Sequence, residues 1–149
     1  MRILTLLLLL LISIPAFSQS GAKLLPKNIK VGEVKEAGVV VAELYYTIVK
    51  KDTTYVITYK NWENLSAVEM QSISFNGKNN AAGKLYELLS SFFGDPDKQE
   101  NGYKLTTKIG NEDVTISLAT VMNSKVVMII TTHGYFNLTE MQVNNLFYP

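Results

Sequence analysis

Residues 80–96, N-A-A-G-K-L-Y-E-L-L-S-S-F-F-G-D-P, carry the pattern around which the rest of the chain can be arranged. Four apolar side chains recur at intervals of three and four residues: Leu85, Leu88, Leu89 and Phe92. This spacing places them on one face of an α-helix. The side chain of Asn79 or Asn80 can cap the first turn, and Gly94 can adopt the left-handed conformation that ends a helix. The pattern predicts an amphipathic helix over residues 81–93 that covers a sheet.

Strand-like runs rich in β-branched and aromatic residues flank this helix, three on each side. They span residues 39–50, 54–60, 66–75, 103–109, 114–122 and 125–132. A second helix is predicted over residues 139–148, because Thr139 and Gln142 have the spacing of a capping box. The order predicts an α+β fold with one six-stranded, mostly antiparallel sheet in βββα-βββα order and two helices packed on one face.

The first hairpin also has a predicted register. Leu44, Tyr46 and Ile48 share one face of their strand, and a two-residue turn within residues 51–53 would set them beside Tyr55, Ile57 and Tyr59. After the last strand, residues 133–137 are expected to bend the chain toward the closing helix. Both halves thus have the same order of elements, but they share no convincing identities, so a duplication stays open.

The N-terminus has the features of a secretory signal peptide over residues 1–18, with Arg2 before a run of about a dozen apolar residues. We expect cleavage after Ser18, with Ser20 as the alternative. The run is too short for a comfortable membrane span, which needs roughly 20 residues. The chain contains no cysteine, so it lacks the residue to which a lipoprotein anchor is attached. We therefore expect an exported protein, periplasmic or secreted, with no membrane span after signal removal.

Domain organisation follows from these segments. Residues 19–38 are weakly patterned and are expected to form an N-terminal arm along a sheet edge, through Ile29 and Val31 among others. Residues 39–149 are expected to form a single α+β domain, because a mature chain of about 130 residues is long enough for one hydrophobic core.

The charge balance excludes some partners. Of the 14 Lys and Arg residues, one is Arg2 in the leader, which leaves 13 lysines against 13 Asp and Glu. Arginine is the usual bidentate reader of phosphates and guanine edges. A nearly neutral body without arginine therefore argues against nucleic acid as a partner.

The sequence predicts no catalytic constellation, no metal site and no cofactor. His133 is the only histidine, and no nucleophile motif accompanies it. The acidic loop at residues 95–100 lacks the ligand spacing of an EF-hand. Glu43 and Glu69 lie on predicted strands and could form a facing pair, as glycoside hydrolysis requires, but surface positions explain them more simply.

Aromatic side chains are the remaining signal. Most are explained by cross-strand packing. Tyr45 points away from Tyr46 and is expected to be exposed, and Trp62 falls in a connection between strands. We therefore name Tyr45, Trp62 and His133 as candidate binding residues.

These observations predict a small exported, non-enzymatic binding or accessory domain of the cell envelope. Its partner would be an envelope or extracellular protein or a glycan. Two alternatives remain open at this point. The first is a small hydrolase that uses carboxylates or His133, and the second is a carrier of an apolar ligand held between the helices and the sheet.

Overall fold

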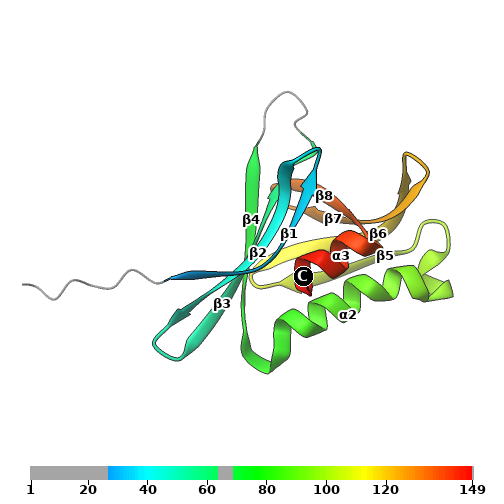
Figure 1. Cartoon of the computed structure of the whole chain (residues 1–149). Helices are drawn as coiled ribbons and strands as arrows, with labels where there is room; N and C mark the ends of the chain where they lie inside the picture. Colours follow the sequence, from blue (N-terminus) through cyan, green and yellow to red (C-terminus); the bar gives the residue numbers. More distant parts are fainter. Residues whose placement is uncertain (1–26, 64–68, 149) are drawn as a thin grey trace, which may run out of the picture.

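The computed structural model describes residues 27–63 and 69–148. Within these residues the elements follow the order ββββα-ββββα (Figure 1). The strands are β1 (Asn28–Glu36), β2 (Val39–Val49), β3 (Asp52–Lys60), β4 (Met70–Asn76), β5 (Lys104–Ile109), β6 (Glu112–Val121), β7 (Ser124–Thr131) and β8 (Gly134–Thr139). The α-helices are α2 (Ala81–Gly94) and α3 (Glu140–Phe147), and the short 3-10 helices are η1 (Lys78–Asn80) and η2 (Pro96–Gln99). The predicted α+β class is confirmed, whereas the predicted signal peptide lies outside the described residues.

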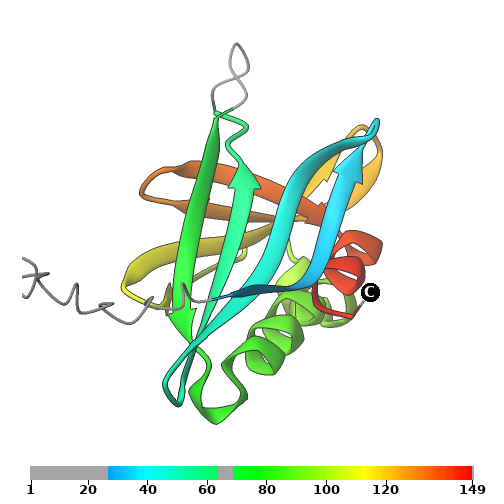
Figure 2. The ribbon, with the colours of Figure 1, turned by 60° about the vertical axis from the view of Figure 1, so that its left-hand side comes forward.

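The described strands form two four-stranded antiparallel sheets, so the prediction of one six-stranded sheet is wrong. Sheet A has the order β1-β2-β3-β4 and sheet B the order β5-β6-β7-β8. Within each sheet every strand pairs with its neighbours in sequence, whereas β4 and β5, which flank α2, do not pair with each other. The strands of the two sheets run in crossing directions, and both helices lie together on one side (Figures 1 and 2). Helix α3 contacts strands of both sheets, while α2 packs on α3, β6 and β7.

Two strands were missed in the sequence, for different reasons. Strand β1 falls in the segment expected to be an arm. Its alternation is hidden by irregular pairing on either side of Gly32, at Lys30–Gly32 and at Val34–Lys35. Strand β8 falls largely in the expected bend. Its core face is built by Phe136 and Leu138, which are buried, and it pairs with β7 along its whole length.

The first hairpin pairs the predicted faces, although its earlier turn shifts the register along the strands and sets Ile48 opposite Thr53. Leu44 lies opposite Ile57, and Tyr46 lies opposite Tyr55, with ring centroids 5.6 Å apart. Val49 faces Asp52, so the turn is made by the two residues between them, slightly earlier than predicted. The apolar pattern therefore decided the pairing even though the turn residues did not reveal its position.

Helix α2 buries the predicted face and ends at the predicted place, but its predicted caps are wrong. Its buried side chains are Leu85, Leu89 and Phe92. Asn80 precedes the helix in a left-handed conformation and makes no side-chain capping hydrogen bond. Its side chain lies against Gly83 instead, where a Cβ atom would be 2.4 Å from Asn80 Nδ2. Gly94 is the last helical residue, and the chain leaves through extended Asp95 rather than through a left-handed glycine.

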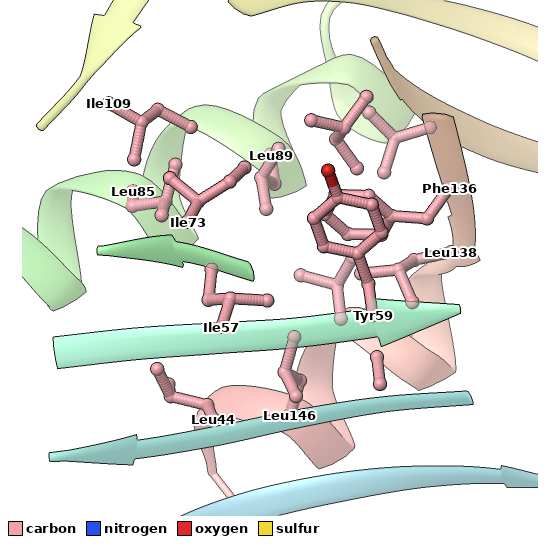
Figure 3. Close-up of a cluster of buried hydrophobic side chains, with 14 of the residues drawn as sticks. Leu44, Ile57, Tyr59, Ile73, Leu85, Leu89, Ile109, Phe136, Leu138 and Leu146 are labelled. Carbon is pink, nitrogen blue, oxygen red and sulfur yellow. The ribbon is translucent and has the colours of Figure 1, made fainter. Parts of the chain in front are cut away.

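The hydrophobic core is shared by both sheets and both helices (Figure 3). Tyr59 of sheet A stacks on Phe136 of sheet B with ring centroids 4.3 Å apart. Leu146 of α3 is fully buried between them and Leu44 of β2 (Figure 3). The capping box that begins α3 is present as predicted, with Thr139 accepting from Gln142 N and donating its own N–H to Gln142 Oε1. The two halves of the chain thus fold into one packed unit.

Candidate functional site

The two sheets are joined at one end by a buried asparagine. Asn61, at the end of β3, is 5% exposed. Its Nδ2 donates to the backbone oxygen of His133 at 3.2 Å, and its Oδ1 accepts from the backbone N–H groups of Tyr135 at 3.3 Å and Glu63 at 3.0 Å. The next residue, Trp62, donates its backbone N–H to Tyr135 O at 3.0 Å. We call this set (Asn61, Trp62, His133, Gly134 and Tyr135) the Asn61 cluster.

Gly134 makes the approach of Asn61 possible. Its φ angle is +120°, a conformation that L side chains rarely adopt. A Cβ atom there would lie 2.1 Å from Asn61 Oδ1. A second glycine, Gly110 in the β5–β6 turn, touches the backbone of β4 in a similar way, with a would-be Cβ 2.0 Å from Ser74 O. The β5–β6 and β7–β8 turns, at one end of sheet B, therefore pack against sheet A.

A groove opens beside the Asn61 cluster, on the face of sheet B that points away from the core. Its volume is about 510 Å³. It is lined by Glu36, Trp62, Val121, Met122, Ser124, Val126, Met128, Tyr135, Asn137, Thr139 and Gln142. We call it the outer groove. The β1–β2 hairpin supplies Glu36 and the β6–β7 hairpin supplies Met122, and Figure 1 shows the tips of both hairpins projecting on the same side of the molecule.

The alternation of two strands explains why the floor of the outer groove is partly apolar. Along β8, Tyr135 and Asn137 alternate with core residues, and Met128 of β7 lies directly opposite Asn137. The run V-V-M-I-I of β7 is apolar on both faces, so its outward side remains apolar where no helix covers it. At the rim, Met122 is 95% exposed in the β6–β7 turn. The groove therefore offers aromatic and flexible thioether side chains to a ligand.

The electrostatic character of the outer groove is close to neutral. Glu36 is the only charged side chain among the described residues that line it, and its Oε1 accepts from Gln142 Nε2 at 3.1 Å. Lys60 lies next to Trp62, with its Nζ 4.1 Å from the centroid of the indole ring. This cation–π contact holds the lysine and the indole together. The lining suits an uncharged ligand better than an anionic one.

The three predicted binding residues have different positions. Trp62 lines the outer groove, as a contact residue would. His133 belongs to the adjoining turn, with an exposed ring, and it enters the Asn61 cluster through its backbone oxygen. Tyr45 lies on the opposite face of β2 from Leu44, where it pairs with Lys30 and Val56, and it is not among the residues that line the groove. The structure thus brings Trp62 and His133 into one region and leaves Tyr45 outside it.

The residues considered for hydrolysis are not brought together. Glu43 lies on the face of β2 away from the core, 3.5 Å from Lys30 Nζ. Glu69 accepts from Gln71 Nε2 just before β4, a strand whose odd-numbered residues, such as Ile73, face the core. The two carboxylates therefore belong to different faces of sheet A, with β3 between their strands. Among the described residues there is also no group of three or more His, Cys, Asp or Glu side chains suited to a metal ion.

A second, smaller cavity of about 290 Å³ bears on the idea of an apolar carrier. It lies between α2 and the strands on either side of it, with Phe75, Leu85 and Leu88 in its wall and Lys84 at its edge. The space between the helices and the sheets is otherwise filled by the buried side chains of the core. The outer groove is the larger of the two spaces and the one that contains a predicted binding residue.

Sequence reasoning missed Asn61, Tyr135, Met122 and Met128 as site residues. Asn61 falls in the connection that also contains Trp62, and nothing in its local sequence distinguishes it as a site residue. The apolar character of β7 on both faces was the one available signal for the groove floor. No local pattern links Asn61 to Gly134, because 73 positions of sequence separate them.

Comparison of the chain with protein-family models, with curated proteins and with solved structures gives no match. Within residues 27–63 and 69–148, no helix is both long and apolar enough to cross a membrane. Function must therefore be argued from the geometry of the site itself.

Proposed function

We propose that the protein is an exported, non-enzymatic binding domain of the cell envelope, and that it binds its partner through the outer groove. The observation that supports this most directly is the composition of the groove. Aromatic, aliphatic and methionine side chains line a hollow of about 510 Å³ between two hairpins, with one charged side chain among its described lining residues. Exposed apolar hollows of this kind are typical of interaction sites rather than of bare surface.

The partner class that this lining favours is a protein segment with apolar, uncharged side chains. Trp62 and Tyr135 provide large aromatic contact area, and residues of this type dominate binding energy at protein interfaces. Met122 and Met128 can adapt to differently shaped side chains. Asn137 and Gln142 can satisfy the backbone polar groups of such a segment. A glycan-binding surface would be expected to carry more polar groups than the floor of this groove does.

Capture from envelope extract with matched variants tests this proposal. The full chain, its Trp62→Ala variant and its Tyr45→Ala variant would each be used as bait, and the dissociation constant of any captured protein would then be measured with purified components. We expect Trp62→Ala to weaken binding about tenfold or more, as for a central interface residue. Tyr45→Ala should bind like the wild type, because Tyr45 does not line the groove.

Three outcomes would contradict the proposal. A partner whose affinity is unchanged by Trp62→Ala would place the binding surface elsewhere. A glycan panel in which a saccharide binds in a Trp62-dependent manner, while no protein does, would keep the groove but replace the partner class. Hydrolytic turnover by the purified protein, lost on substitution of His133, would favour the enzyme alternative instead.

A further inference from the structure

Asn61 and Trp62 follow the end of β3, and two backbone–backbone hydrogen bonds and one to the Asn61 side chain hold this stretch in place. Asn61 N donates to Glu69 O at 2.8 Å, on the sheet A side. On the sheet B side, Trp62 N donates to Tyr135 O at 3.0 Å. Between them, the Asn61 side chain accepts from Tyr135 N, so that its amide takes the place of a main-chain partner for the edge strand β8. The backbone of Trp62 is thereby attached to both sheets.

The hydrogen bonding of the Asn61 side chain is nearly complete, although the residue is buried. Its Oδ1 accepts two backbone N–H groups, from Tyr135 and Glu63, and its Nδ2 donates to His133 O. A buried amide with this many fixed partners has one orientation, because any rotation would leave polar groups unpaired. A glycine is present where Asn61 enters the β7–β8 turn, since any Cβ atom at position 134 would collide with its amide.

From this geometry we propose that Asn61 is a positioning residue, which holds Trp62 at the wall of the outer groove by tying the end of β3 to the β7–β8 turn. One consequence of this inference rests on the proposed function: ligand affinity should depend on Asn61, although the Asn61 side chain does not line the groove. The positioning itself is a property of the protein without ligand. The two parts can therefore be tested separately.

The chain offers a direct reporter, because Trp62 is its only tryptophan. The emission maximum and the acrylamide quenching of the folded, unliganded protein would be compared for the wild type, Asn61→Ala and Asn61→Asp. Asn61→Asp keeps the oxygen acceptors but cannot donate to His133 O when ionised. A control variant, Val143→Ala, removes volume from a fully buried site and should lower stability, and its helix, α3, contributes no residue to the Asn61 cluster. All measurements would be made at a temperature where circular dichroism shows each variant to be folded.

We expect a shifted emission maximum and a changed quenching constant in Asn61→Ala, a smaller change in Asn61→Asp, and wild-type values in Val143→Ala. Unaltered Trp62 emission and quenching in folded Asn61→Ala, with only a lower melting temperature, would overturn the positioning role. If Asn61→Ala does not fold, the same criterion applies to Asn61→Asp. If Trp62 responds as expected but a groove-dependent partner binds the Asn61 variants normally, the positioning holds and its consequence for affinity is wrong.

Discussion

Replacement of Gly134 by alanine should be one of the most damaging small substitutions in this protein. Two costs arise at this position. The backbone has a φ angle of +120°, and a non-glycine residue held in such a region costs of order 1–3 kcal/mol. The new methyl group would also lie 2.1 Å from Asn61 Oδ1 and 2.4 Å from Asn61 Nδ2, so the amide must move.

The second cost follows from the hydrogen bonds that the displaced amide would lose. Asn61 is buried, and its movement leaves the backbone groups of His133 and Tyr135 without their partner. An unsatisfied buried polar group costs about 1–3 kcal/mol. Together the two costs give a loss of about 2–6 kcal/mol in the free energy of unfolding, against about 5–15 kcal/mol for a typical domain.

Urea unfolding monitored by Trp62 fluorescence and by far-UV circular dichroism measures this loss, with ΔG from linear extrapolation. Gly102→Ala is the matched control, because Gly102 also has a positive φ angle of +91° but nothing within 4 Å of a would-be Cβ atom. It should show the backbone cost without the collision. In the background of Asn61→Ala, which removes the colliding amide, Gly134→Ala should likewise lose only about 1–3 kcal/mol.

Two results would refute this reasoning. The first is a loss for Gly134→Ala no larger than that for Gly102→Ala. The second is an equal loss for Gly134→Ala in the wild-type and Asn61→Ala backgrounds, since a double-mutant cycle without coupling would mean that the two residues do not constrain each other.

Two further predictions concern single side chains. Thr139→Ala removes the side-chain acceptor of the α3 capping box and should lower the free energy of unfolding by about 0.5–2 kcal/mol, measured by urea unfolding; an unchanged midpoint would mean that the cap contributes nothing. Burial raises the pKa of Tyr59, with a smaller raising effect from the charge of Glu112, while the hydrogen bond with Thr131 lowers it in part. Above about pH 10 the unfolded chain loses the tyrosine proton while the native state keeps the proton of Tyr59. The contribution of Tyr59 to the free energy of unfolding is therefore complete below about pH 10 and is lost as the pH rises beyond that value. Stability should fall less steeply above pH 10 in Tyr59→Phe than in the wild type, and equal slopes would contradict the assignment.

The elements that were predicted well have strong local patterns. Helix α2 was found from the spacing of Leu85, Leu89 and Phe92, which are buried as expected. The faces of the first hairpin were paired correctly because a shift by one residue would set Leu44 and Tyr46 beside the threonine-rich face of β3 and expose the tyrosines of that strand. Strand β8 was missed because its glycine and asparagine resemble a turn, and its strand conformation depends on pairing with β7.

The candidate site was predicted in part. Trp62 was selected as an aromatic residue in a connection between strands, and it does line the outer groove. Tyr45 was selected from the alternation of its strand, and it does not line the outer groove. Trp62 lines a groove because β8 and the β6–β7 hairpin form the walls beside it, and these elements lie at least 50 positions further along the chain.

By itself, the sequence determined the local elements of this protein, namely its helices, most of its strands and the faces that they bury. It could do so because period, capping and turn preferences act between residues a few positions apart. Only the tertiary structure decided that the strands divide into two sheets and that Trp62 lies at the wall of a groove. These outcomes depend on contacts such as that of Asn61 with His133, 72 residues away, which preferences between neighbouring residues do not encode.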